Sequence, residues 1–319
     1  MLSAAENRPH ISVLLDEAIN YLSPKDGGVY VDGTFGAGGH TRAILQAADC
    51  SVYAIDRDDS VKKFVAELKE EFGDRITFIQ GCFGDMEELL RENGVDKVDG
   101  ILLDIGVSSM QIDTPMRGFS FSHDGPLDMR MGSEGESAAD FVNNYEEEEI
   151  ANVIYKYGDE RKSRAIARLI VKAREEDGPI MTTERLAGIV KRAVRSYNDK
   201  INPATRTFQA LRMWVNDELG ELEKGLEASK NMLKIGGRVV IVTFHSGEDS
   251  IVKQFFNDLC GKGAGVSRYQ PLPTQDLSAP IFKLVTRKAI KPSDDEVNDN
   301  IRARSAKIRA AEKISEVLK

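Results

Sequence analysis

The first hundred residues alternate between runs typical of β-strands and runs typical of α-helices, and this alternation restricts the fold more than any other feature. Strand-like segments lie at residues 28–32, 51–56, 75–79 and 98–104. Helical segments separate them at residues 41–45, 60–72 and 86–93. Because strands that alternate with helices form parallel sheets covered on both faces, the sequence predicts a doubly wound, Rossmann-like α/β sheet.

The alternation stops after residue 106. Residues 106–128 are rich in Gly, Ser, Asp and Pro, as in a long functional loop, and residues 138–194 are helical in pattern. One amphipathic helix is predicted from Phe208 to Leu226, before strand-like runs resume at 236–244 and 281–286. We therefore predict a discontinuous sheet domain (1–111 and 213–319) and an inserted helical domain (112–212) for substrate recognition.

The loop after the first strand has the character of a ligand-binding loop. It runs from Asp32 to His40 and contains four glycines, Gly33, Gly36, Gly38 and Gly39, the last three closely spaced. Glycines let a backbone approach a ligand, and the following helix offers free N–H groups. The third glycine of the dinucleotide pattern is missing, and the acid Asp32 suits a cationic ligand such as S-adenosylmethionine. Asp56, at the end of the second strand, is placed to accept hydrogen bonds from ribose hydroxyls.

Two further candidates follow later strands. Phe83 comes after the third strand, where an aromatic ring either packs on an adenine or belongs to the core. Asp104 ends the fourth strand. Ligands of open α/β sheets bind at the carboxyl ends of strands, so Asp32, Asp56 and Asp104 should share one edge of the sheet.

The charge distribution predicts a polyanionic partner for only part of the chain. The net charge is −9, yet residues 151–215 hold 14 Lys and Arg against 7 Asp and Glu, net +7. The tail 301–319 holds 6 against 2, net +4. Either these segments attract RNA, or they are ordinary solvated helix surfaces.

Other composition features narrow the class of protein. The 3 cysteines lie far apart, and the 4 histidines show no ligand spacing, so no metal is expected. No apolar run is long enough for a membrane span, and residues 1–9 lack the apolar core of a signal peptide. These features predict a protein of a reducing compartment, the cytoplasm.

Several longer motifs resemble those of the RsmH (MraW) family, and the resemblance runs from about His10 to Lys313. They are Asp32–His40, Asp104–Ser109, Arg117–Phe121, Asp124–Met131, Pro203–Arg212, Phe244–Ser246 and Arg304–Lys307. The resemblance implies a class I methyltransferase fold with an inserted helical domain. It also implies transfer of a methyl group from S-adenosylmethionine to the N4 amine of a cytidine in the P-site region of 16S rRNA, within the small ribosomal subunit.

The resemblance also implies roles for individual residues. By position, the cofactor residues are Gly38, Gly39, His40, Asp56, Phe83, Asp104 and Gln111. Asp104 is the candidate catalytic residue, because an acceptor that holds the N–H groups of an amine localises its lone pair toward the methyl group. The segment Asp104-Ile-Gly-Val keeps only the acid of the motif that amino-methyltransferases usually have at this position. That the methyl acceptor is an amine is therefore implied by the family resemblance and not by these residues.

Polar residues flanking the insertion are candidates for RNA contacts. They are Arg117, Asp124, Asp128, Arg130, Arg206, Gln209, Arg212 and His245. A splayed base could stack on Phe119 or Phe121. The alternative is that pairs such as Arg117 with Asp124 only connect the two domains.

Four positions depart from the family pattern: Asn202, Gly247, Ser250 and Ile301. Because these residues differ from the family's, the resemblance does not carry RNA contacts over to the neighbourhoods of Gly247 and Ile301. The sequence disfavours two other functions. The missing third glycine and the acid Asp32 disfavour an NAD-dependent oxidoreductase, and the intact Asp32 loop, Asp56 and Asp104 disfavour a non-catalytic ribosome-assembly factor.

Overall fold

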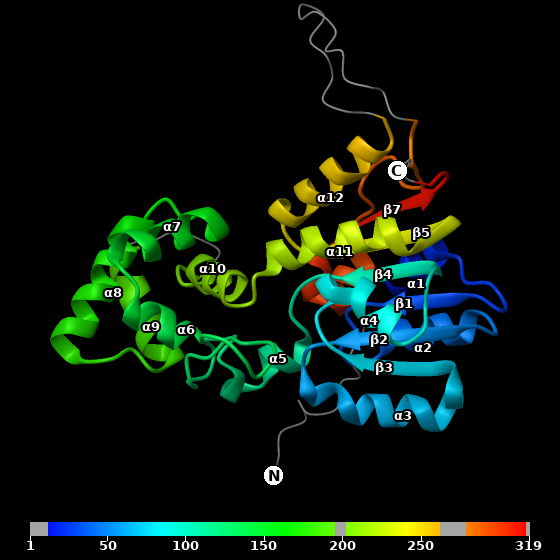
Figure 1. The fold of residues 1–319 in the computed structure, drawn as a ribbon. Coiled ribbons are helices and arrows are strands. Elements are labelled where there is room, and N and C mark those ends of the chain that lie inside the picture. Colours follow the sequence, from blue (N-terminus) through cyan, green and yellow to red (C-terminus); the bar gives the residue numbers. More distant parts are fainter. Residues whose placement is uncertain (1–11, 195–201, 262–278, 317–319) are drawn as a thin grey trace, which may run out of the picture. The chain divides into compact units, whose positions relative to one another are not determined.

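The chain divides into two compact units, each with a core of its own. A computed structural model describes residues 12–194, 202–261 and 279–316 (Figure 1). One unit combines Met1–Gly106 with Gly220–Lys319, and the other is Val107–Leu219. Residues 1–9, which bear on the signal-peptide prediction, and Arg195 and Lys200 of the basic stretch lie outside the described residues.

The first unit is built on one seven-stranded sheet with the order β3-β2-β1-β4-β5-β7-β6. The strands are β1 (Val29–Asp32), β2 (Ser51–Asp56), β3 (Ile76–Gln80), β4 (Val98–Asp104), β5 (Leu233–Thr243), β6 (Phe282–Leu284) and β7 (Lys307–Lys313). β1 to β5 pair in parallel, and β7 runs antiparallel to both β5 and β6. The predicted doubly wound α/β sheet is confirmed.

Helices between the strands cover this sheet. They are α1 (Leu15–Leu22), α2 (Gly39–Ala47), α3 (Lys62–Phe72), α4 (Met86–Glu92), α11 (Glu218–Met232), α12 (Ser246–Leu259) and α13 (Asp294–Asp299). The central strand β4 is apolar on both faces, and Ile101, Leu102 and Leu103 are fully buried. After β1 the chain builds β2 and β3 on one side, and then returns to build β4 and β5 on the other. The strand order therefore reverses between β1 and β4, which is where open α/β sheets bind ligands.

The C-terminal segment, whose residues 301–319 carry a net charge of +4, is part of the sheet, and its attraction for RNA stays a prediction. β7 lies between β5 and β6, and its residues alternate between buried and half-buried. Lys307 and Arg309 both bond the Asp249 carboxylate. Lys313 is fully buried and donates to the carbonyls of Lys230 and Leu233. Because these cations serve the fold, deleting the residues after Asn300 would remove a strand and could not report on RNA binding.

The second unit is helical in its described part. It contains α5 (Ser109–Asp113), the 3-10 helix η4 (Pro115–Arg117), α6 (Ala138–Asn144), α7 (Glu147–Gly158), α8 (Ser163–Asp177), α9 (Thr183–Ala193) and α10 (Thr205–Val215). In α8, Ile166, Ala167, Ile170 and Ala173 are buried at helical spacing. Rings of Phe141, Tyr145 and Trp214 stack in the same core, with the Phe141 and Trp214 centroids 4.0 Å apart.

The predicted long helix from Phe208 to Leu226 is two helices. α10 ends at Val215 and α11 begins at Glu218. Asp217 between them has φ 47°, in the left-handed region, which interrupts the helix. The side chain of the neighbouring Asn216 forms hydrogen bonds with the backbone of Met129 and Met131. The apolar spacing continues across this break, so periodicity alone could not reveal it.

Candidate active site

The acids predicted at the strand ends meet at the point where the strand order reverses. Asp32 of β1 pairs in register with Leu102 of β4, and Asp104 of β4 pairs with Val242 of β5. Asp56 ends β2, beside β1. Adjacent strands thus present Asp56, Asp32, Asp104 and the start of α12 along one edge of the sheet.

The glycine loop leaves the N-terminus of α2 open. Gly36 and Gly38 have φ values of 53° and 78°, which other residues rarely adopt. A Cβ atom on Gly39 would lie 2.1 Å from the Ser12 Oγ, so a larger residue there would force the Ser12 side chain to move. Among the residues that the structure describes, no side chain caps α2, and the first turn of this helix contains no acid. This helix end therefore suits an anionic group, such as the carboxylate of an amino-acid ligand.

Asp32 organises this loop from within. Its carboxylate is completely buried and accepts from the Thr41 hydroxyl at 2.7 Å and the Thr34 backbone N–H at 3.2 Å. Burial raises the pKa of Asp32 to about 6. The sequence interpretation made Asp32 the partner of a cationic ligand, whereas the structure engages both of its oxygens inside the loop.

Asp56 both fixes the loop and keeps the capacity for further bonds. It accepts from the backbone N–H groups of Gly36 at 2.7 Å and Asp58 at 2.9 Å. Burial raises its pKa, although the residue is half-buried. A carboxylate has about four lone-pair positions, so Asp56 keeps the capacity to accept from a hydroxyl of a ribose.

Asp104 is the most unusual group at this edge. Its Oδ1 atom is buried and has no hydrogen-bond partner among the described residues, and its Oδ2 lies 3.8 Å from the His40 Nδ1. The side chain is 22% exposed. Burial, with the charges of Asp32 and Glu248 added, raises the pKa of Asp104 to about 8. A buried acceptor without a donor is costly, so this oxygen is suited to an N–H group or a cation from a ligand.

Phe83 is half-buried and packs on α11. A Cβ atom on Gly225 of α11 would lie 2.6 Å from the Phe83 ring, so that ring needs the glycine beside it. Phe83 also borders the apolar core of the first unit. The structure thus gives the ring a packing role, and its contact with an adenine stays a prediction.

His245 begins α12, and its side chain is committed to the helix end. Its Nδ1 accepts from the N–H groups of Gly247 at 3.0 Å and Glu248 at 3.4 Å. In return the fully buried Glu248 accepts from the N–H groups of Phe244 and His245. Sequence reasoning missed Glu248, although a Glu three residues after a helix-capping residue signals this capping box.

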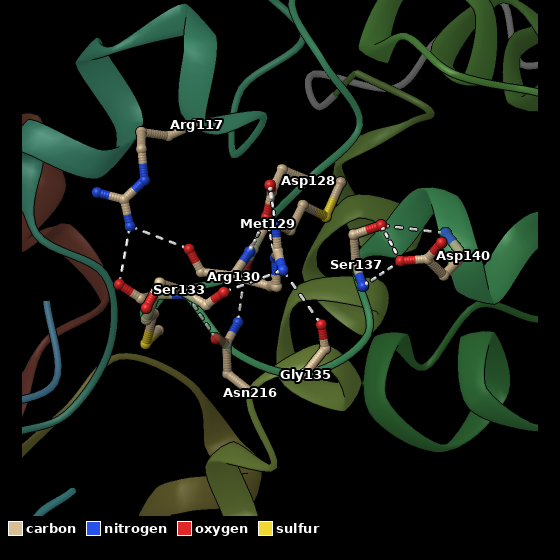
Figure 2. A network of polar contacts seen from close by, with 10 residues as sticks. Arg117, Asp128, Met129, Arg130, Ser133, Gly135, Ser137, Asp140 and Asn216 are labelled. Carbon is tan, nitrogen blue, oxygen red and sulfur yellow. Dashed lines mark hydrogen bonds and ion pairs between the residues drawn. The ribbon is translucent and has the colours of Figure 1, made fainter. Parts of the chain in front are cut away.

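The predicted RNA-contacting residues near the start of the insertion form a network inside the second unit. Figure 2 shows Arg117 donating to the carbonyls of Arg130 and Met131, while Arg130 binds Asp128 with two bonds of 2.8 Å. Asn216 bridges Met129 and Met131, and the buried Met129 has φ 64°. These arginines therefore fix the loop at 124–131, and direct RNA contact by them stays a prediction.

The other predicted residues of this unit also have internal partners. Asp124 accepts from the Glu184 N–H at the start of α9, and Gln111 accepts from the Ser108 N–H in a capping box. Arg212 forms two 2.7 Å bonds with Glu218. Arg206 donates to the Asp159 carbonyl, and Gln209 lies 3.9 Å from the Met213 sulfur. Asn202, one of the departures, accepts from the Ala204 N–H ahead of α10.

The described residues offer neither a metal-binding cluster nor a membrane-spanning helix. They contain no group of three or more His, Cys, Asp or Glu side chains arranged to hold a metal ion. None of the helices described is both long and apolar enough to cross a membrane.

Comparison with known proteins gives one consistent result. The family model described as "MraW methylase family" matches residues 7–314. A protein of Paramagnetospirillum magneticum named ribosomal RNA small subunit methyltransferase H is 56% identical, covering 95% of each chain. One of Rhodospirillum rubrum with the same name is 52% identical over 96% of this chain and 94% of its own. The chain therefore belongs to the MraW methylase family, as its glycine loop and strand-end acids had indicated.

Proposed function

We propose that this protein transfers a methyl group from S-adenosylmethionine to the N4 amine of a cytidine in the decoding region of 16S rRNA. The substrate is the rRNA within the small ribosomal subunit, in the cytoplasm. The observation that carries this proposal is Asp104, whose buried Oδ1 has no partner among the described residues at the point where the strand order reverses. The names of the relatives support rRNA as the substrate.

The cofactor is S-adenosylmethionine, as the sequence analysis predicted for a methylase. When bound, it supplies an electrophilic methyl group on a sulfonium. The uncapped N-terminus of α2 suits its carboxylate, and the remaining lone pairs of Asp56 suit its ribose. His40 and the glycines of the loop line the same region, and Phe83 is the candidate for its adenine.

The protein has two chemical tasks. It aligns the methyl donor with the acceptor, and it directs the lone pair of the cytosine amine toward the methyl group. Methyl transfer is an in-line displacement, and holding the two reactants in line is worth on the order of 7–11 kcal/mol in good cases. The Asp104 carboxylate accepts an N–H of the cytosine amine, which localises the nitrogen lone pair toward the methyl group. The Thr34 hydroxyl fixes the Asp104 backbone through a 2.6 Å bond from the Asp104 N–H. No general base is required, because the methylated amine is acidic enough to lose its proton to water.

Cofactor selectivity gives the first prediction. Thr41 occupies the position of the third dinucleotide glycine, and its buried side chain bonds Asp32. Since the loop thus lacks the close backbone approach that a pyrophosphate needs, S-adenosylmethionine should bind and NAD should not. Calorimetry with both ligands measures this. S-adenosylhomocysteine, which has the same nucleoside without the sulfonium charge, is the matched control, and tighter binding of NAD would contradict the assignment.

The proposed reaction is tested by tritium transfer from labelled S-adenosylmethionine to small subunits that lack the modification. We expect label in 16S rRNA and, after digestion and mass spectrometry, one cytidine methylated at N4. Already methylated subunits are the control. Label at carbon 5 of a pyrimidine, or in protein, would contradict the N4 assignment, and no label at all would favour a non-catalytic assembly role.

A further inference from the structure

A second carboxylate lies behind the predicted catalytic one. Glu248 is completely buried in the first turn of α12, directly after β5. Its Oε2 accepts the Phe244 N–H at 2.8 Å and the His245 N–H at 3.3 Å. Its Oε1 lies 3.0 Å from the His245 Nε2. Val242 of β5 lies beside Asp104 in the sheet, and Glu248 bonds the backbone two residues further on, so this carboxylate lies just past the end of the strand that neighbours β4.

A structural cap does not require this arrangement. In two other capping boxes, those of α6 and α7, the acid at the third helical position, Asp140 or Glu149, is exposed and stays hydrated. Here the acid of the capping box is fully buried, and its charge acts on Asp104 together with that of the buried Asp32. Burying like charges together is costly unless the fold or the function requires it.

We propose that Glu248 is a positioning residue for methyl transfer, whose fixed negative charge makes Asp104 a stronger acceptor for the N–H of the target amine. The inference rests on the proposed function, because it assigns a purpose to Asp104 in that reaction. Among the described residues, the His40 Nδ1 of α2 lies 3.8 Å from the Asp104 Oδ2, and the charges of Asp32 from β1 and Glu248 from α12 act on Asp104. Asp32 is already bonded to Thr34 and Thr41, so the charge supplied from α12 is the one that a substitution can remove without opening the glycine loop.

The charge has a second consequence for ligand choice. A negative potential at Asp104 stabilises a cationic ligand more than a neutral one of the same shape. The protein should therefore favour S-adenosylmethionine over S-adenosylhomocysteine, and part of that preference should depend on Glu248.

The test follows the protonation of Asp104 directly. In protein labelled with ¹³C at aspartate side-chain carboxyls, the Asp104 signal is assigned by its loss in Asp104→Asn, and its titration midpoint is measured without cofactor. Glu248→Gln keeps an oxygen for the Phe244 N–H but removes the charge. We expect the Asp104 midpoint to fall by about one pH unit. Glu312→Gln, which removes a charge from β7 where Glu312 pairs with Arg238 and Lys283, should leave the midpoint unchanged.

A merely structural role for Glu248 predicts otherwise. A folded Glu248→Gln protein with an unchanged Asp104 midpoint and an unchanged ratio of affinities for S-adenosylmethionine and S-adenosylhomocysteine would overturn the inference. If Glu248→Gln does not fold, Glu248→Asp is used, because it withdraws the charge by one methylene. For the inference to hold, the Asp104 midpoint in that variant must fall, by less than the pH unit expected of Glu248→Gln. Because neither measurement needs methyl transfer, a wild-type protein that fails to label rRNA would sink the proposed function separately.

Discussion

Asp104→Asn is expected to lose methyl transfer by at least about 10²-fold, a typical effect of removing one transition-state contact. Asparagine has nearly the shape of the aspartate but cannot supply a full negative charge to the amine N–H. Single-turnover rates with small subunits and saturating S-adenosylmethionine measure the loss. A folded Asp104→Asn enzyme with near-wild-type rates would show that Asp104 is not in the reacting site.

The same substitution should stabilise the protein, and the pH dependence of that effect has a defined sign. The folded-state pKa of Asp104 is about 8, above the value of about 3.9 in an unfolded chain. Wild-type stability from this group is therefore fully present below about pH 4 and is lost progressively as the pH rises toward 8. Because asparagine does not ionise, the rise in Tm of Asp104→Asn should be absent near pH 4 and largest near pH 8.

The pH profile of the wild-type enzyme provides an independent readout. If the reaction needs the Asp104 carboxylate, kcat/KM should rise with pH, reach half of its maximum near pH 8 and level off above that pH, because kcat/KM reports the protonation of the free enzyme. The acid limb should be missing from the residual activity of Asp104→Asn. An identical limb in both proteins would assign the titration to another group.

The sheet and its ligand edge could be predicted from the sequence because both follow from local patterns. Apolar runs fix the strands, and acids at the ends of parallel strands must share one edge. Asp56 and Asp104 were found in this way, and both lie there. What an individual side chain bonds is decided by neighbours distant in sequence, so the internal bonding of Asp32 could not be foreseen.

What the charged residues of the sequence bond could not be predicted, for the same physical reason. β7 reads Lys-Ile-Arg-Ala-Ala-Glu-Lys, and its charges hide a strand whose cations bond Asp249 and buried carbonyls of other elements. Likewise Arg117 and Arg130 are predicted to contact RNA, whereas the structure turns both toward their own loop (Figure 2), and their contact with RNA stays a prediction. Charge counted along a sequence predicts a partner only where the cations remain exposed.

The start of α8 meets that condition. Arg161, Lys162 and Arg164 are exposed there, and the first turn of α8 contains no acid. Cations at a helix N-terminus oppose the helix dipole by a few tenths to about 1 kcal/mol each, so helix stability does not explain them. A polyanionic partner would explain these exposed cations, and rRNA is the polyanion of the proposed function.

Reversing these three charges with Arg161→Glu, Lys162→Glu and Arg164→Glu should weaken binding to small subunits by about 10²-fold at low salt. The slope of log K against log salt should flatten by about 2, because up to three phosphate contacts disappear. Acids at this helix end favour the dipole, so Tm should not fall, and affinity for S-adenosylmethionine should stay unchanged. The matched control is Lys62→Glu, Lys63→Glu and Lys69→Glu on α3, three exposed lysines of the first unit, which changes the net charge equally. If both triple variants lose binding alike, only the overall charge matters; if neither alters the slope, the RNA is held elsewhere, and the α8 cations are an ordinary solvated surface.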